Sequence, residues 1–160
     1  MSTEIEHKFL VNPKLLPRLP KGRKLIQGYL CAKPVIRARI STDKNRRRAA
    51  FLTIKGKGLR VRAEYEYPIP VADARRLLKL CGSRVIEKIR YEWDGWEIDQ
   101  FLGKHRGLWL AEYELHSARA KLPMLPDWVG KEVTSDPRFH NVNMARATLT
   151  KRQLTQLIFR

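Results

Sequence analysis

Residues Leu108–Ser117 read LWLAEYELHS, and this stretch decides what kind of sheet the chain forms. Successive side chains of a strand alternate between two faces, so Trp109, Ala111, Tyr113 and Leu115 form one apolar face. The other face also begins with two leucines, Leu108 and Leu110, before it reaches Glu112 and Glu114. A strand this apolar is predicted to be enclosed, and both glutamates are predicted to be buried. Buried carboxylates need a cation, hydrogen bonds or a metal ion.

The same alternation recurs along the chain and predicts eight strands joined by short turns. Dipeptides such as Asp94-Gly95 suit tight hairpins, so neighbouring strands should pair antiparallel. Helical periodicity occurs at Val71–Cys81, with Gly82 at its end, and at Thr150–Arg160. We predict one α+β domain over residues 1–160, an eight-stranded antiparallel closed β-barrel (tunnel) with flanking helices. The predicted strands are Thr3–Val11, Leu25–Cys31, Val35–Ser41, Ala50–Gly56, Arg60–Pro68, Arg84–Asp94, Trp96–Leu102 and Leu108–Ser117.

One face of these strands is charged almost without interruption, whereas a one-sided sheet normally has a mixed solvent face. An eight-stranded barrel has room for side chains or one small ligand, so these charges are predicted to meet inside it. Seven cations and seven anions face this way, which makes the interior formally neutral. They are Lys8, Arg37, Arg39, Lys55, Arg62, Lys88 and Arg90, with Glu4, Glu6, Glu64, Glu66, Asp99, Glu112 and Glu114.

This mixture of charges has a chemical meaning. Clustered carboxylates suit a hard divalent cation such as Mg²⁺ or Mn²⁺, and arginine and lysine suit phosphate oxygens. Both together fit a metal-chelated polyphosphate, whose cleavage depends on positioning and electrostatics. A barrel core of salt bridges that binds no ligand is the alternative that the residues leave open.

The formal net charge of the chain is +17, and since the predicted interior is balanced, the excess lies outside it. Such a surface suits solubility, attraction of anions or a polyanionic partner such as a nucleic acid. Cys31 and Cys81 stand far apart and indicate neither a disulfide framework nor a zinc site. No signal-peptide pattern or long apolar run is present, so we expect a cytoplasmic protein that does not span a membrane.

Motifs spread over about 140 residues resemble those of the CYTH, or triphosphate tunnel, superfamily. Its N-terminal ExExK signature occurs here as Glu4-Ile5-Glu6-His7-Lys8. The other matches follow in order: Gln27-Gly28-Tyr29-Leu30, Arg37-Ala38-Arg39, Thr53-Ile54-Lys55-Gly56, Glu64-Tyr65-Glu66, Lys88-Ile89-Arg90, Trp96-Glu97-Ile98-Asp99, Gly107-Leu108, Ala111-Glu112-Tyr113-Glu114-Leu115 and Gly130-Lys131-Glu132-Val133-Thr134.

The resemblance implies a role for all of these charged positions except Arg62. It implies that a small triphosphate substrate is held by Lys8, Arg37, Arg39, Lys55, Lys88 and Arg90, and that Mg²⁺ or Mn²⁺ lies near Glu4, Glu6, Asp99, Glu112 and Glu114, with Glu64 and Glu66 also lining the tunnel. Tyr29 and Lys55 match residues that are linked to water activation in triphosphatase members. Members of the family are often dimeric, which implies a homodimer. The histidines and tryptophans are expected to be surface, packing or barrel-wall residues, with His7 facing away from the tunnel.

Within the superfamily the compact chain looks most like bacterial inorganic triphosphatases. This likeness implies hydrolysis of tripolyphosphate to pyrophosphate and phosphate. A class IV-type adenylyl cyclase or a thiamine or nucleoside triphosphatase would need a pocket for the organic group, and the sequence identifies none. A noncatalytic polyphosphate- or RNA-binding module is the alternative of another class, and the many carboxylates count against it.

Overall fold

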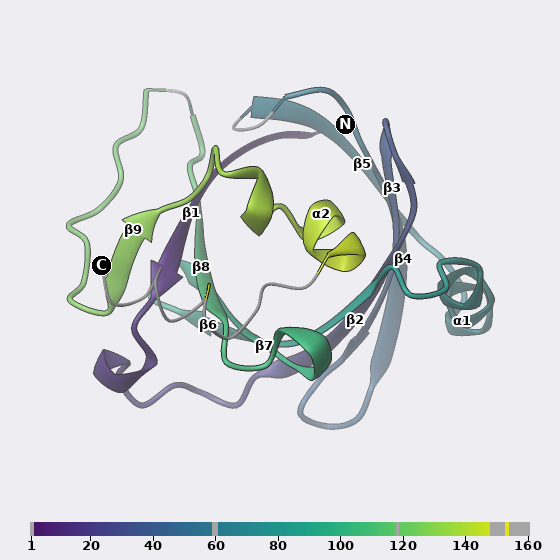
Figure 1. The fold of residues 1–160 in the computed structure, drawn as a ribbon, viewed down its shortest axis with the longest axis horizontal. Coiled ribbons are helices and arrows are strands. Elements are labelled where there is room, and N and C mark those ends of the chain that lie inside the picture. The colour runs from purple at the N-terminus through teal and green to yellow at the C-terminus, as the bar shows by residue number, and fades with distance from the viewer. Residues whose placement is uncertain (1, 59–60, 118, 148–152, 154–160) are drawn as a thin grey trace.

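The computed structural model describes residues 2–58, 61–117, 119–147 and 153. Nine strands form one antiparallel sheet that curls around an interior (Figure 1). The strands are β1 (Ser2–Val11), β2 (Arg23–Ala32), β3 (Val35–Thr42), β4 (Arg48–Lys55), β5 (Val61–Pro68), β6 (Val85–Trp93), β7 (Trp96–Phe101), β8 (Trp109–Glu114) and β9 (Val129–Glu132). The helices are α1 (Val71–Leu80) and α2 (Asn141–Arg146), with 3₁₀ turns η1 (Pro13–Leu15), η2 (Gly103–His105) and η3 (Pro137–Phe139).

The sheet order is β5-β4-β3-β2-β6-β7-β8-β1-β9. The first residues of β1 also pair with β5, from Ser2 opposite Glu64 to Ile5 opposite Val61. The later residues of β1 pair with β8 and β9. The prediction of an antiparallel sheet is confirmed, but the strand count was wrong because β9 adds a ninth strand. Among the described residues β5 and β9, which stand at the two ends of this order, are not hydrogen-bonded to each other, and β5 pairs with β1 instead.

Local chemistry explains two of the connections. Asp94 and Gly95 both have positive φ, 48° and 78°, which is the backbone of the tight turn that suits the twist of a hairpin. Helix α1 lies outside the sheet against β2, β3 and β4. It comes so close at Gly28 that an added Cβ would stand 2.7 Å from Sγ of Cys81. The helix predicted over Val71–Cys81 is therefore confirmed, and glycine is required beneath it.

One end of the interior is apolar. Side chains from β1, β2, β6, β7 and β8 meet Phe139 and Met144, and all of them are buried. Helix α2 thus lies inside the ring of strands (Figure 1). This short helix and β9 were not predicted from the sequence. The helix that was predicted over Thr150–Arg160 falls outside the described residues, apart from Gln153.

A second apolar cluster lies on the outer face of β1, β7 and β8. Trp96 is its centre, with ring centroids 4.9 Å from Tyr113, 5.3 Å from Trp128 and 5.6 Å from Phe9. The other two tryptophans pack against the same cluster, so all four are wall residues, as predicted. This outer packing leaves the opposite face of the same strands free to carry charge.

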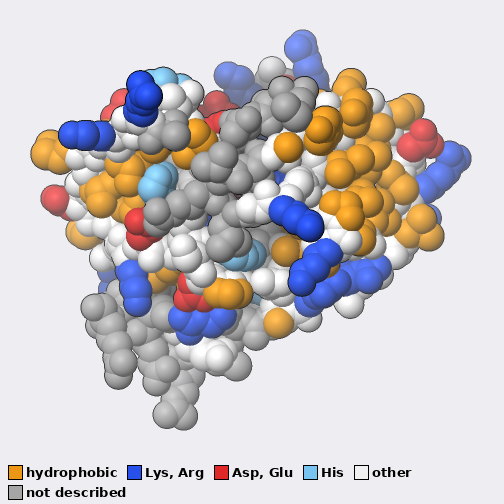
Figure 2. Space-filling model, turned by 90° about the horizontal axis from the view of Figure 1, so that it is seen from above, with side chains coloured by type: hydrophobic (Ala, Val, Ile, Leu, Met, Phe, Trp, Pro, Cys, Tyr) orange, Lys and Arg blue, Asp and Glu red, His pale blue; other side chains and the backbone are white. Residues whose placement is uncertain are grey.

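The outer surface is rich in lysine and arginine. Blue side chains surround the face seen in Figure 2, and red ones are fewer, in keeping with the net charge of +17. In the part of the chain that is described, we find no helix with the length and apolarity needed to cross a membrane.

Candidate functional site: a charged cavity through the curled sheet

A cavity of about 1140 Å³ lies inside the curled sheet. Its walls come from strands far apart in the sequence, since β1, β2, β3, β4, β5, β6, β7 and β8 all contribute lining residues. Both signs of charge line it: Lys8, Lys33, Arg37, Arg39, Lys55, Lys57, Arg90 and Arg146, with Glu6, Glu64, Glu66, Glu97, Glu112 and Glu114. The prediction that positive and negative side chains converge inside the sheet is therefore confirmed.

The two ends of the cavity differ in charge. Gly95, in the β6–β7 turn, marks one end, and the carboxylates of Glu97 and Glu114 lie on strands that end or begin there. The β2–β3 turn lies at the opposite end of the β2–β6 pair, as the antiparallel register requires. There the charged lining residues include Lys33 of that turn and Arg146 of α2, both exposed cations. An anion entering the cavity thus meets carboxylates at one end and cations at the other.

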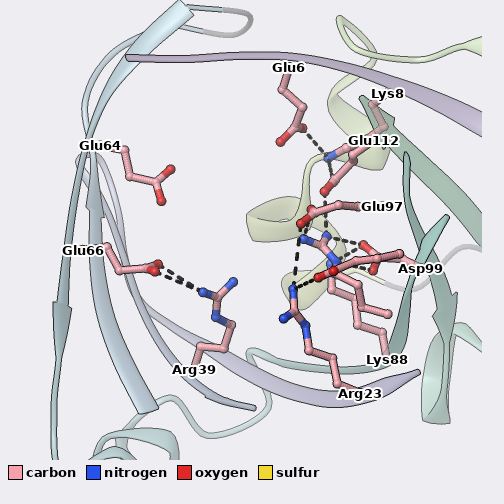
Figure 3. A network of polar contacts seen from close by, with 12 residues as sticks. Glu6, Lys8, Arg23, Arg39, Glu64, Glu66, Lys88, Glu97, Asp99 and Glu112 are labelled. Atoms are coloured by element: carbon pink, nitrogen blue, oxygen red, sulfur yellow. Dashed lines mark hydrogen bonds and ion pairs between the residues drawn. The ribbon is translucent and has the colours of Figure 1, made fainter. Parts of the chain in front are cut away.

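One wall, formed by β1, β6, β7 and β8, carries a buried ion-pair network (Figure 3). Arg90 donates from Nε to Asp99 Oδ1 at 2.7 Å and from NH2 to Asp99 Oδ2 at 2.6 Å. The same NH2 donates to Glu112 Oε2 at 2.7 Å. Lys88 Nζ also bonds Asp99, and Lys8 Nζ lies 3.0 Å from Glu112 Oε1 and 3.5 Å from Glu6 Oε1.

These contacts shift the acidity of the network. Burial would raise the pKa of Glu112, but Lys8 and Arg90 outweigh it and hold that pKa well below the usual range. Burial would likewise lower the pKa of Lys8, yet Glu112 and Glu6 raise it. The pKa of Lys88 is lowered by its burial and by the neighbouring charge of Arg90. The wall is therefore a set of mutually dependent charges with little access to water.

The facing wall, formed by β3, β4 and β5, is more open. Glu66 accepts from Arg39 NH2 at 3.2 Å and from Thr53 Oγ1 at 2.8 Å, and its side chain is 31% exposed. Arg37 NH2 donates to Thr53 Oγ1 at 3.2 Å and lies 3.6 Å from Glu66. Lys55 Nζ pairs with Glu64 at 2.8 Å. Burial and the charge of Arg37 lower the pKa of Arg39 to about 10.

The guanidinium groups of this wall have unused donors. The Nε atoms of Arg37 and Arg39 are buried, and neither has a hydrogen-bond partner within the described chain. A buried donor without a partner is costly, and a phosphate oxygen in the cavity would supply one. This observation favours an anion as the ligand.

Tyr29 lies where the cavity meets the apolar end. It lines the cavity, is 4% exposed, and its hydroxyl oxygen accepts from Gln27 Nε2 at 2.9 Å. Burial raises the pKa of Tyr29, although Arg37 and Lys8 act in the opposite direction. Tyr29 is therefore a neutral phenol near pH 7, suited to orienting a water molecule or a phosphate by hydrogen bonding.

The predicted site residues fall into three groups. Those that line the cavity are Glu6, Lys8, Tyr29, Arg37, Arg39, Lys55, Glu64, Glu66, Arg90, Glu112 and Glu114. Lys88 and Asp99 are each 1% exposed and lie behind Arg90 in the buried network. The side chains of Glu4 and Arg62 lie outside the described part of the structure. Glu112 is buried as predicted, but Glu114 is exposed because β8 ends at this residue.

Several lining residues were missed. Glu97 shares the inward face of β7 with Asp99, so the alternation that found Asp99 could also have found it. Thr53 and Gln27 are uncharged and gave no comparable signal. His140 also lines the cavity and bonds the carbonyl oxygen of Thr134, whereas His105 bonds that of Met144 in the apolar end. His7 pairs with Glu132 and is absent from the cavity lining, as expected.

The cavity residues fit a divalent metal in their chemistry. Carboxylate oxygens are the donors that Mg²⁺ and Mn²⁺ prefer, and the Lys8 ammonium already places a positive charge between Glu6 and Glu112. Glu114 lines the cavity nearby, at the residue paired with Glu6 in the β1–β8 register. Among the described side chains, however, no three acidic, histidine or cysteine groups are drawn together as a ready metal site.

The curled antiparallel sheet and its cavity define a class of protein: a β-structure whose interior is lined by cations and carboxylates together. Residues 2–147 match the CYTH domain family, and the chain belongs to this family. The recognition from sequence motifs is thereby confirmed.

Relatives with known names support this assignment. An inorganic triphosphatase of Acetivibrio thermocellus is 42% identical over 154 residues, which cover 91% of this chain and 95% of that protein. An inorganic triphosphatase of Nitrosomonas europaea is 36% identical over 156 residues, covering 89% and 97%. A solved crystal structure of an inorganic triphosphatase superposes with a TM-score of 0.63 at 33% identity, over 94% of this chain and 99% of that one.

Proposed function

We propose that this chain hydrolyses inorganic triphosphate to pyrophosphate and phosphate inside the charged cavity. The observation that carries the proposal is the pairing of buried, unpartnered arginine donors with carboxylates on the walls of one cavity. A simple anion trap gains nothing from so many negative groups, whereas a metal-chelated triphosphate uses both kinds. The relatives named inorganic triphosphatase agree with this substrate.

The short β1–β5 pairing supports a tunnel that is closed around its substrate. Within it, Arg37 and Arg39 bind phosphate oxygens through their free Nε donors, and Lys8, Lys55 and Arg90 neutralise further charge. Lys88 acts indirectly, since its ammonium is buried on Asp99, which in turn fixes Arg90. Tyr29 orients the attacking water as a neutral phenol, next to Arg37 and Lys8.

Mg²⁺ or Mn²⁺ would be held by Glu6, Glu112 and Glu114 at the acidic end of the cavity, with Glu64 and Glu66 facing them. When bound, the metal supplies a positive charge that neutralises phosphate oxygens and lowers the pKa of a bound water molecule. Asp99 supports this site from behind by fixing Arg90. A cytoplasmic location and a homodimer stay predictions of the sequence. The basic exterior leaves room for a nucleic-acid partner, although none is expected.

The test is product analysis with purified protein, Mg²⁺ or Mn²⁺, and tripolyphosphate, ATP and thiamine triphosphate in parallel, each with an EDTA control. We expect metal-dependent release of phosphate, fastest from tripolyphosphate. Cyclic AMP and pyrophosphate from ATP would instead make the protein a cyclase. Tight, salt-sensitive binding of polyphosphate or RNA without turnover would make it a binding module.

A further inference from the structure

Glu97 lines the cavity, but the proposed reaction gives it no role. It stands near the start of β7, beside the β6–β7 turn, and its side chain is 41% exposed. Its Oε2 accepts a hydrogen bond from Arg90 NH1, and its Oε1 lies 4.0 Å from Arg23 NH2. The two oxygens of Glu97 thus face two guanidinium groups, one on β6 and one on β2 (Figure 3).

The contacts of Arg90 show which of its donors Glu97 occupies. Asp99 accepts from Nε and NH2 of Arg90, and Glu112 accepts from NH2. The remaining nitrogen, NH1, is bonded to Glu97. Asp99 is 1% exposed and cannot leave without stranding buried cations, whereas the half-exposed Glu97 can turn towards water. NH1 is therefore the donor of Arg90 that an incoming anion can bind with the smallest loss of existing contacts.

Arg23 gives the same position a second cation. Its Nε is buried and has no hydrogen-bond partner in the described chain. Its NH2 bonds Glu92 at 2.6 Å, and Arg23 and Arg90 are directly opposite in the β2–β6 register. The Glu97 carboxylate thus lies between the guanidinium groups of Arg90 and Arg23. Two guanidinium groups side by side are also a favourable site for a phosphate group.

We propose that Glu97 is a built-in competing anion, which occupies NH1 of Arg90 until a phosphate group of the substrate displaces it. This inference rests on the proposed function. The binding free energy of an entering anion is reduced by the cost of breaking the Glu97–Arg90 contact, because only the difference between the free and the bound state counts. Tripolyphosphate can offset this cost through its contacts with cations of both walls. Inorganic phosphate reaches fewer cations but must displace the same contact, so Glu97 lowers both affinities by a similar factor.

Two variants separate this role from a general charge effect. Glu97→Gln removes the competing charge and keeps the shape of the side chain. Glu92→Gln removes an equal charge from the residue opposite Glu97 in the β6–β7 register, where the side chain is 65% exposed and contacts Arg23. Both change the long-range field alike, so a difference between them reports on the Arg90 contact.

The experiment is titration calorimetry of both variants and the wild type with tripolyphosphate and with inorganic phosphate in EDTA, alongside KM and kcat with metal. We expect Glu97→Gln to bind both anions about three- to tenfold more tightly and Glu92→Gln to stay within about twofold of wild type. Unchanged or weaker binding by Glu97→Gln, or an equal gain in Glu92→Gln, would overturn the inference. So would loss of metal-dependent turnover with unchanged metal-free binding, since Glu97 would then be a metal ligand.

The binding comparison is independent of turnover. If the wild type does not cleave tripolyphosphate, the proposed function fails, but the affinities still decide whether Glu97 competes with anions. If cleavage is fast and the affinities of wild type and Glu97→Gln are the same, the inference alone fails.

Discussion

The two facing walls of the cavity use the same residue types in different ways. On the β6–β8 side, Arg90, Asp99 and Glu112 are buried and satisfy one another. On the β3–β5 side, Arg39 and Glu66 are more exposed, and the arginines keep unused donors. An ion pair sealed from water, such as Lys88–Asp99, holds geometry because breaking it is costly, whereas a half-exposed partner, such as Glu66 or Glu97, can be exchanged for a ligand. The difference teaches that charge alone does not identify a binding residue.

The largest effect on stability is expected at the buried wall. Asp99→Asn keeps the shape of the side chain but leaves Lys88 and Arg90 without their shared carboxylate. We expect the free energy of unfolding to fall by about 3–5 kcal/mol, the usual cost of breaking a buried pair. Urea denaturation at pH 7 measures it. A loss below about 1 kcal/mol would mean that the two walls do not differ as described.

On the open wall, a substitution is expected to change turnover rather than stability. Glu66→Gln removes the charge that aligns Arg39 and, through Thr53, Arg37. We expect triphosphate turnover to fall about 10- to 100-fold, as for other groups that orient a site. The free energy of unfolding should change by less than about 1 kcal/mol, because Glu66 is partly exposed. Steady-state kinetics and urea denaturation of one preparation give both values, and a large stability loss with normal kinetics would reverse the assignment of the walls.

Acid should weaken the buried wall. The pKa of Glu112 is held well below its ordinary value of 4.5 in the folded protein, so the unfolded chain binds the proton more readily. The stabilisation by Glu112 is therefore fully present above about pH 4.5 and is lost as the pH falls towards the folded-state pKa. Urea denaturation between pH 7 and pH 3 should show stability declining below that value. If Glu112→Gln showed the same decline as wild type, Glu112 would not be its source.

The smallest effect is expected on the outer face of β6, the strand that carries Arg90. Glu87 of β6 pairs with Lys24 of β2 at 3.0 Å, and both side chains are nearly half exposed. Glu87→Gln should change the free energy of unfolding by less than about 0.5 kcal/mol and leave turnover unchanged. This variant is the matched control for the interior substitutions, since it removes a carboxylate from the same sheet without touching either wall. A clear loss of activity would show that the outer charges also serve the reaction.

Much of the fold could be predicted because period-2 alternation is local. It placed the first eight strands and told which side chains of each face inward, so Arg37 and Glu112 were found together from sequence alone. Strand β9 has four residues, one of them Gly130, and α2 has six, so neither carries a usable period. Both elements are fixed by long-range contacts.

The sequence predicts which side of the sheet each site residue faces, but not how deeply its side chain is buried. Alternation shows that Asp99 and Glu97 point the same way, but not that Asp99 is sealed behind Arg90 while Glu97 reaches the cavity. Depth depends on the curvature of the sheet and on where each strand ends, as the exposure of Glu114 at the end of β8 illustrates. The resemblance to the family implied which residues hold phosphate and which hold metal. The structure shows which of them line the cavity and which wall each belongs to.

The central claim is that the carboxylates of the cavity support metal-dependent cleavage of tripolyphosphate. The most direct measurement is phosphate release from tripolyphosphate by wild type and Glu6→Gln, with Mg²⁺ or Mn²⁺ and with EDTA. We expect turnover by the wild type that EDTA abolishes, and a loss of at least about 100-fold in Glu6→Gln, which should stay folded and still bind tripolyphosphate. Equal turnover by the two proteins, or turnover that EDTA does not affect, would contradict the account.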